Sequence, residues 1–261
     1  MSAEDHSLGD REDVQLTFIR VARDPAKLTS RPPGEPALHR FDDPLGEYLV
    51  RYGAEDLETA VLEVLATLRS KPAVDDVTAS VTGADDGYGQ DAGLGAGEEP
   101  PLGGLPPQPK VETVREVLQG LKVGKVCIRQ SGAFADVSDW TMRSALGKDA
   151  RVRAAIHEFD GLVGNPADRV SALDGALIRL AGKVGRRITQ AVSRAVYEQV
   201  QYLGIVTNSR WDDRKRCWAV FGEVEATVEE IEPLDPNNEE HRTAVAKAAA
   251  LHGFPLPAEW S

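Results

Sequence analysis

The sequence predicts an α+β fold. Short segments with strand-like alternation and longer segments with helical periodicity both occur, but they do not follow one another regularly along the chain. The absence of a regular βαβ order favours an α+β arrangement over a parallel α/β sheet. The 261 residues, 41% of them hydrophobic, are enough to bury one sizeable core with appended segments.

The expected elements run from a strand at the N-terminus to a helix near the C-terminus. We expect strands over 14–22, 47–52, 125–130, 204–211, 217–223 and, at a sheet edge, 226–234, and helices after Asp56, over 111–121, over most of 152–200 and over 242–253. A core-facing stripe in the third helical region consists of Ile188, Ala191, Val192, Ala195, Val196 and Val200. Gly204 is expected to end that helix, and Gly253 to cap the last one. The polar DDRKR turn then joins two strands as a hairpin.

The helix after Asp56 contains an acidic residue that lacks charged neighbours. Asp56 is a suitable N-cap, and Lys71-Pro72 is expected to end the helix. The apolar stripe is formed by Leu57, Ala60, Val61, Val64, Leu65 and Leu68. Glu63 lies far from this stripe, in a neutral sector made by Thr59, Leu62, Ala66 and Thr67. Either Glu63 is an ordinary exposed glutamate, or its carboxylate projects into a cleft from a neutral wall.

The first expected strand carries a charged residue in phase with its core residues. Leu16 and Phe18 share one face of the segment VQLTFIRVA, and Arg20 falls on the same face. A buried guanidinium without a partner is costly, so Arg20 must meet an anion or reach a pocket. The Pro- and Gly-rich stretch 24–47 that follows predicts a long loop, which holds HRFDD at 39–43.

The charge distribution excludes some classes of partner. The net charge of −12 argues against nucleic acid, because phosphate backbones need a basic face. The stretch 73–109 has seven acids and no base, and its Gly- and Pro-rich composition predicts a disordered insert rather than a phosphate loop. No apolar segment resembles a signal peptide or a membrane span, so we expect a soluble, cytoplasmic protein.

Most familiar catalytic signatures are missing from the sequence. Cys127 and Cys217 are too few and too far apart for a disulfide framework or a zinc site, and each lies in an apolar run typical of a reduced, buried thiol. The histidines have no metal-binding spacing, and no GxSxG motif is present. The remaining candidates are arginines, an aromatic, a carboxylate and a hydroxyl, namely Arg20, HRFDD with Arg40, Tyr52, Glu63 and Ser209.

Four segments resemble, in order, the successive blocks of the RES-domain family. They are FIRVA, HRFDD, YGAEDLETAVLEVL and ITQAVSRAVYEQVQYLGIVTNSRWDDRKRCWAVF, within residues 14–70 and 120–223. The resemblance implies an ADP-ribosyltransferase-like fold, interrupted by the disordered acidic insert that the composition predicts. It divides the chain into an N-terminal tail (1–13), a first RES part (14–72), the insert (73–110), a second RES part (111–232) and a C-terminal helix and tail (233–261).

The resemblance also implies attack on NAD⁺ at the nicotinamide–ribose bond, by phosphorolysis or hydrolysis. NAD⁺ is then the substrate and phosphate a co-substrate, with no cofactor and no metal. By matching positions, Glu63, Arg20, Tyr52 and Ser209 would be catalytic, and Arg20, Arg40, Tyr52 and Ser209 would bind substrate. The family contains toxins of bacterial toxin–antitoxin pairs, which implies an antitoxin partner; self-association stays open.

These residue types suit the chemistry of that reaction. Loss of nicotinamide leaves an oxocarbenium-like ribose, which a lone carboxylate such as Glu63 stabilises. Arginine forks suit a pyrophosphate, an aromatic ring can stack on nicotinamide or ribose, and a short hydroxyl can fix a carboxamide or ribose. We expect Arg20, Tyr52 and Glu63 to meet around one pocket.

Plainer interpretations stay open beside this one. Arg20 could pair with Asp42, Tyr52 could be a tyrosine at the edge of the core, and HRFDD could be a loop salt bridge. Two further functions also remain, namely transfer of ADP-ribose to a target and an inactive RES-type interaction module.

Overall fold

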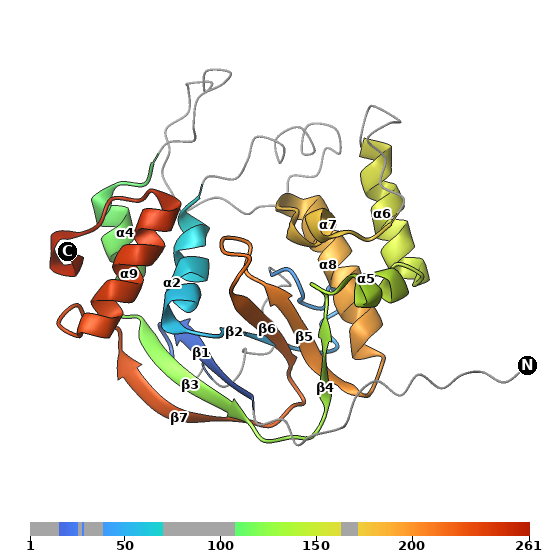
Figure 1. Ribbon diagram of the computed structural model, residues 1–261, viewed down its shortest axis with the longest axis horizontal. Helices are drawn as coiled ribbons and strands as arrows, with labels where there is room; N and C mark the ends of the chain where they lie inside the picture. The colour runs from blue at the N-terminus through green and yellow to red at the C-terminus, as the bar shows by residue number, and fades with distance from the viewer. Residues whose placement is uncertain (1–15, 26–27, 29–38, 70–107, 163–171) are drawn as a thin grey trace, which may run out of the picture.

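The computed structural model describes residues 16–25, 28, 39–69, 108–162 and 172–261 (Figure 1). These residues form a mixed α+β fold with a seven-stranded sheet, which confirms the predicted fold class. Most of the expected insert over 73–110 lies outside the described residues. Within the described ranges, no helix combines the length and apolar character needed to cross a bilayer.

The elements follow one another as strands and helices in mixed order. The strands are β1 (Leu16–Ala22), β2 (Val50–Ala54), β3 (Lys122–Ile128), β4 (Ala133–Asp136), β5 (Tyr202–Asn208), β6 (Arg216–Phe221) and β7 (Ala226–Pro233). The helices are α2 (Leu57–Leu65), α4 (Val111–Leu118), α5 (Trp140–Leu146), α6 (Ala150–Leu162), α7 (Gly175–Arg179), α8 (Gly182–Tyr197) and α9 (Glu239–His252), with 3₁₀ turns η1 (Ala66–Leu68) and η3 (Ala258–Trp260).

The sheet carries its helices in two groups on one face. Its strand order is β4-β5-β6-β2-β1-β3-β7, and every neighbouring pair is antiparallel except β4 and β5. Figure 1 shows α2, α4 and α9 above one half of the curved sheet and α5 to α8 above the other. Strands β2 and β6 run between the two groups, so side chains on their helix-facing side point toward the space that separates them.

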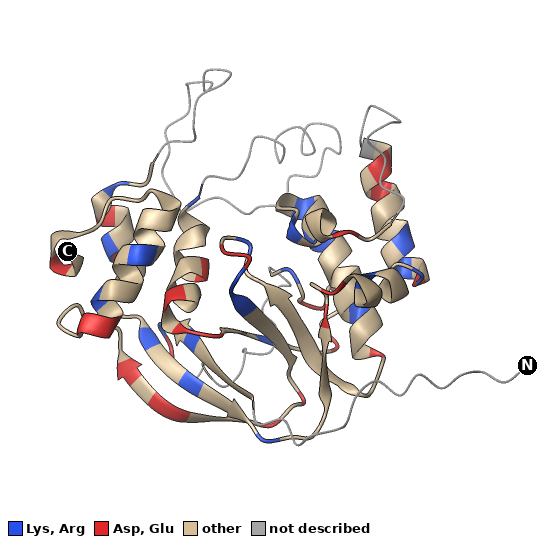
Figure 2. Cartoon of the chain, viewed as in Figure 1, with Lys and Arg blue, Asp and Glu red and all other residues tan. Residues whose placement is uncertain are grey.

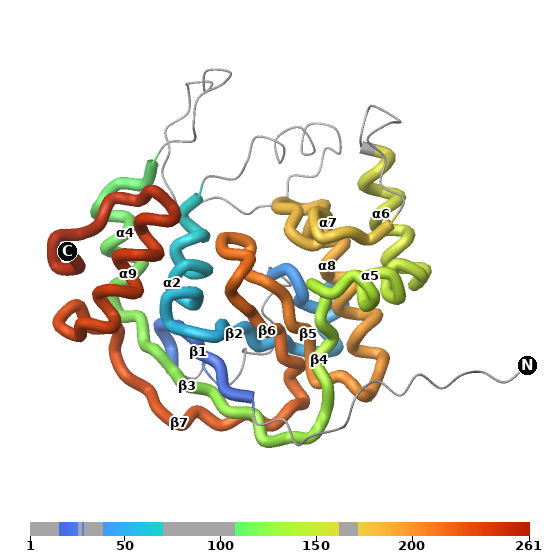
Figure 3. Tube along the Cα trace, viewed as in Figure 1, coloured from blue at the N-terminus to red at the C-terminus, as the bar shows by residue number. Residues whose placement is uncertain are grey.

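Each helix group encloses a core of its own. One core joins α2, α4 and α9 around Val61, Leu65 and Val245, which are buried completely. The other joins α8 to β5 and β6 around Ile188 and Ile205. Figure 3 shows α2 and α9 side by side although they come from opposite ends of the chain. The C-terminal helix thus supports the helix that carries Glu63.

Helix α2 begins as its sequence predicts. The Asp56 carboxylate accepts a hydrogen bond of 2.8 Å from the Thr59 backbone N–H, which identifies Asp56 as the N-cap. The α-helix ends at Leu65 and continues as η1, so it is shorter than the Lys71-Pro72 boundary suggested. Thr59 and Leu62, from the neutral sector around Glu63, are buried. Thr59 and Leu62 therefore lie against protein, as the cleft interpretation of Glu63 requires, whereas Thr67 at the other end of the sector is exposed.

Several sequence-based boundaries are wrong. Strand β2 begins at Val50 rather than at residue 47, and Val200 is 96% exposed rather than part of the α8 core face. Helix α8 ends at Tyr197, while Gly204 lies inside β5. Strand β4 and helix α5 were not expected at all. The hairpin of β5 and β6, the edge strand β7 and the left-handed Gly253 cap (φ 71°) are confirmed.

Gly204 belongs in β5 because the neighbouring strand leaves no room for a side chain. A Cβ at this position would lie 2.3 Å from the Ala219 carbonyl oxygen. We predict that Gly204→Ala lowers the free energy of unfolding by about 1–3 kcal/mol, because strand backbone has to shift. Gly161→Ala is the control, since nothing lies within 4 Å of that helical position and alanine favours helix. Urea denaturation measures both, and equal losses would contradict the explanation.

Candidate functional site

Glu63 is held by a hydrogen bond from the end of strand β5. The Ser209 hydroxyl donates to Glu63 Oε1 at 2.6 Å. Ser209 is 1% exposed, and its Oγ accepts the Trp211 backbone N–H at 3.2 Å, which leaves the hydroxyl proton for the carboxylate. Among the described residues, no hydrogen bond reaches Glu63 Oε2. One oxygen is therefore fixed by the protein, and the other is available to a ligand.

A cysteine lies on the sheet beneath the same carboxylate. Cys217 of β6 places its Sγ 3.8 Å from Glu63 Oε1. Burial, followed by the charge of Glu63, raises the pKa of this thiol well above its ordinary value. Cys217 thus stays protonated at neutral pH, which suits a weak donor to the carboxylate rather than a nucleophile.

The HRFDD loop is fixed by Tyr52. The Tyr52 hydroxyl accepts the Phe41 backbone N–H at 2.9 Å and donates to Asp42 Oδ1 at 3.0 Å. The Ser193 hydroxyl of α8 binds the Phe41 carbonyl at 2.7 Å. These bonds fix the backbone that directly follows Arg40, so the loop is more than a salt bridge. Tyr52 positions it.

Two arginines from distant segments lie beside Glu63. Arg40 donates to the Ile178 carbonyl at the end of α7, and Arg210 Nη2 donates to the Leu180 carbonyl at 3.0 Å. Burial, followed by Arg210, lowers the pKa of Arg40 to about 10, while Glu63 acts in the opposite direction. Because Glu63 raises the pKa of both Arg40 and Arg210 against the effect of burial, the two guanidinium groups and the carboxylate form one electrostatic cluster.

Protein surrounds the side chains of this cluster, but solvent still reaches two of them. Solvent still reaches Arg40 and Tyr52. Nevertheless, burial is the largest cause that lowers the pKa of Arg40 and raises that of Tyr52 well above its ordinary value. A side chain that is surrounded by protein yet wetted lies in a depression, as binding sites do. Tyr52 belongs to β2 and Cys217 to β6, the two paired strands that run between the two helix groups (Figure 1).

Arg20 lies on the reverse face of the sheet, away from this cluster. Ile19 pairs directly with Ala54, and directly paired residues share a face. Alternation then places Tyr52 on the face of Ile19, and Arg20 on the other. Arg20 Nη1 instead donates to the Leu28 carbonyl at 3.1 Å. The expectation that Arg20 joins the other site residues in one pocket is therefore wrong, because strand alternation opposes it.

The C-terminal helix braces the backbone next to Glu63. His252 Nε2 donates to the Leu62 carbonyl at 2.8 Å, and its Nδ1 accepts from Arg69 Nε at 2.9 Å. Because Nδ1 is an acceptor, His252 is neutral with its proton on Nε2. The Trp211 ring packs edge-on against His252 at 4.9 Å between centroids. The segment after Ser209 and the helix that bears Glu63 thus share one support.

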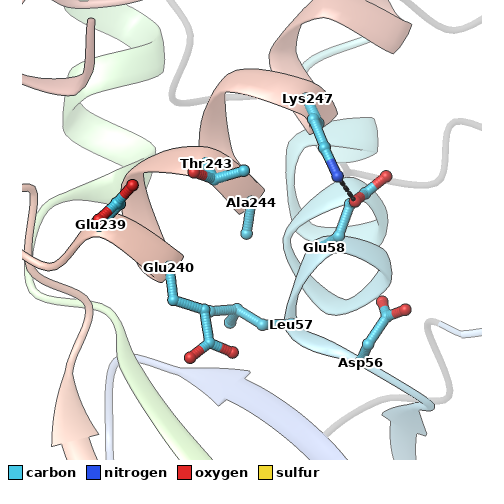
Figure 4. A pocket seen from close by; sticks show the side chains of 8 residues that line it. All are labelled: Asp56, Leu57, Glu58, Glu239, Glu240, Thr243, Ala244 and Lys247. Carbon is cyan, nitrogen blue, oxygen red and sulfur yellow. Dashed lines mark hydrogen bonds and ion pairs between the residues drawn. The ribbon is translucent and has the colours of Figure 1, made fainter.

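A separate groove lies between α2 and α9. Figure 4 shows its lining, which includes Glu240 and the ion pair of Lys247 with Glu58 at 3.1 Å. Its volume is about 580 Å³. Glu58 and Glu63 are five residues apart, about 140° around the helix, so this groove opens on another side of α2. Its acidic lining does not suit a phosphorylated ligand.

The predicted site residues are largely brought together. Arg40, Tyr52, Glu63 and Ser209 meet, whereas Arg20 does not. Arg210 and Cys217 were missed, although Arg210 directly follows Ser209 in the sequence. Within the described part of the chain, no three His, Cys, Asp or Glu side chains converge as metal ligands would.

Comparisons with known proteins give one distant likeness. No protein-family model and no curated protein match the chain. Among solved structures, the chain is similar to one in the M. tuberculosis MbcT–MbcA toxin–antitoxin complex, at 12% identity and a TM-score of 0.42, over 90% of this chain and 91% of that one. Residue roles are therefore taken from the contacts within this chain.

The Tyr52 hydroxyl should stabilise the fold by fixing the loop. We predict that Tyr52→Phe lowers the free energy of unfolding by about 1–3 kcal/mol, because the buried Asp42 carboxylate and the Phe41 N–H lose a partner. Tyr202→Phe is the control, since no described residue binds that hydroxyl. Chemical denaturation compares the two variants, and an unchanged midpoint for Tyr52→Phe would reject the role.

The brace at His252 should be sensitive to acid. Burial lowers the pKa of His252 below its usual 6.5, while Arg69 lowers it further and Glu63 raises it. Between the lowered pKa of His252 in the folded chain and its pKa of about 6.5 in the unfolded chain, the unfolded chain binds more protons. The free energy of unfolding therefore falls as the pH drops through this interval. We predict a shallower loss of stability between pH 7 and 5 for His252→Gln than for the native chain. The exposed His157→Gln is the control, and three identical pH profiles would contradict the assignment.

Proposed function

We propose that this protein degrades NAD⁺ by cleaving the bond between nicotinamide and ribose, with phosphate or water as acceptor. The observation that carries the proposal is the Glu63 carboxylate, held by Ser209 at 2.6 Å beside Arg40. These residues occupy the positions that the resemblance to RES domains assigns to the site. The ADP-ribosyltransferase-like character of the fold is part of the same proposal.

The proposed reaction separates charge, and the cluster suits that separation. Nicotinamide leaves with the bonding electron pair, so its ring nitrogen becomes neutral while positive charge develops on the ribose. Glu63 Oε2 accepts a hydrogen bond from the ribose 2′-hydroxyl and faces the developing charge. Phosphate oxygen or water then attacks the anomeric carbon, and an attacking water passes its extra proton to solvent.

The other side chains prepare this step. Ser209 keeps the carboxylate of Glu63 in one orientation, and the protonated Cys217 lies beneath it. Tyr52 fixes the loop that presents Arg40, and its ring remains the proposed surface for nicotinamide or ribose. The binding of the pyrophosphate, which was expected of Arg20, passes to Arg40, because Arg40 lies near Glu63 and Cys217.

A role as the toxin of a toxin–antitoxin pair, in the cytoplasm, belongs to the proposal too. It rests on the resemblance of the sequence blocks, and it implies an antitoxin as partner. Transfer of ADP-ribose to a target uses the same first step, so labelled NAD⁺ distinguishes the two reactions. Label on a macromolecule supports transfer, whereas free ADP-ribose or its phosphorylated product supports degradation. An inactive interaction module would leave NAD⁺ intact.

Glu63→Gln should abolish most of the turnover. We predict that kcat for NAD⁺ falls by about a hundredfold or more, because the amide cannot stabilise the developing positive charge. Glu58→Gln is the matched control, since it changes a carboxylate on another side of the same helix. Nicotinamide release, followed by chromatography, measures both variants after circular dichroism has shown that they are folded. Full activity of Glu63→Gln would reject the assigned role.

A further inference from the structure

Arg210 has no assigned role, yet it lies in the cluster around Glu63. It directly follows Ser209, whose hydroxyl holds the carboxylate. Its Nη2 donates to the Leu180 carbonyl, two residues from the Ile178 carbonyl that binds Arg40. Two guanidinium groups from segments 170 residues apart are thus anchored on one short stretch of backbone, at the end of α7 and directly after it.

Both guanidinium groups keep unused donors. The Nε atoms of Arg40 and Arg210 are buried, and no described residue accepts a hydrogen bond from them. A buried N–H donor without a partner costs free energy unless a ligand satisfies it. The carbonyl bonds fix each side chain in place, so the remaining N–H groups are oriented before a ligand arrives. Preorganised forks of this kind match the oxygens of phosphate groups.

The surrounding charge is positive. Glu63 is the acidic group that acts on both arginines, whereas Arg186 lies close enough to Arg210 to lower its pKa further after burial has done so. Figure 2 shows basic residues along α7 and the start of α8, which contain Arg179, Lys183, Arg186 and Arg187. An anion placed here offsets the repulsion between the cations. Arg179 and Arg187 pair with Asp213 and Glu158, whereas Glu63 acts on both Arg40 and Arg210.

We propose that Arg40 and Arg210 form a paired guanidinium site for a phosphate-class anion beside Glu63. The inference rests on the proposed function for its substrate class and adds Arg210 as a binding residue. Two anions of this class take part in the proposed reaction, namely the pyrophosphate of the dinucleotide and the free phosphate that acts as acceptor. In either case Arg210 binds an anion, while Glu63 acts on the ribose.

Calorimetric titration of the full chain tests the site. The probes are ADP-ribose, which carries the pyrophosphate without the scissile bond, and inorganic phosphate. We expect Arg210→Met to weaken binding of ADP-ribose by about ten- to a hundredfold, as loss of charge-assisted hydrogen bonds does. Arg210→Lys keeps the charge but loses the fork, so it should fall between the native chain and the methionine variant.

Arg214→Met is the matched control. Arg214 lies four residues further along, its side chain is 85% exposed, and it pairs with Asp212. The Arg214→Met variant should bind both probes as the native chain does. Arg40→Met should reproduce the defect of Arg210→Met, and circular dichroism with thermal melting checks that each variant is folded. If Arg210→Met misfolds, Arg210→Lys and Arg40→Met provide the test.

The outcomes separate the two sources. Weaker ADP-ribose binding identifies the pyrophosphate as the occupant, and a loss confined to inorganic phosphate identifies the acceptor. Unchanged binding of both probes to Arg210→Met, or no binding of either to the native chain, would overturn the proposal. Turnover of NAD⁺ is measured in parallel. Arg210-dependent binding without turnover would keep the anion site and reject the proposed reaction.

Discussion

The hydrogen bond from Ser209 to Glu63 is the contact on which the account depends. It joins helix α2 to the β5–β6 hairpin across 146 residues of sequence, and it fixes the one carboxylate that faces two arginines. Its geometry follows from elements on either side. Asp56 starts α2, the packing of α9 holds the helix against the sheet, and β5 ends where Ser209 begins. Moving any of these elements would separate hydroxyl and carboxylate.

The arrangement of the helices on the sheet also explains how the charged side chains of the cluster come together. The two helix groups lie on one face of the sheet, and the paired strands β2 and β6 run between them (Figure 1). Side chains from that face, such as Tyr52 and Cys217, form the floor, while Arg40 and Arg210 approach from the α7–α8 side. Glu63 is thus the acid that acts on both guanidinium groups. An anionic, ribose-containing ligand matches this pattern.

Local patterns in the sequence were enough to identify much of the fold and part of the site. The neutral sector around Glu63 left open an exposed glutamate or a carboxylate in a cleft, and the burial of Thr59 and Leu62 favours the cleft. Alternation correctly put Arg20 in phase with Phe18, but the face on which a site lies depends on the pairing between strands. That pairing is a non-local property, and a single strand does not encode it. Arg210 and His252 were missed for the same reason.

The central claim is that this cluster breaks the nicotinamide–ribose bond of NAD⁺. The most direct measurement incubates the purified native chain with NAD⁺, with and without inorganic phosphate, and quantifies free nicotinamide and the sugar product by chromatography. The account predicts nicotinamide in amounts that exceed the enzyme many times, together with ADP-ribose or its 1″-phosphate. NAD⁺ that stays intact under both conditions would contradict it.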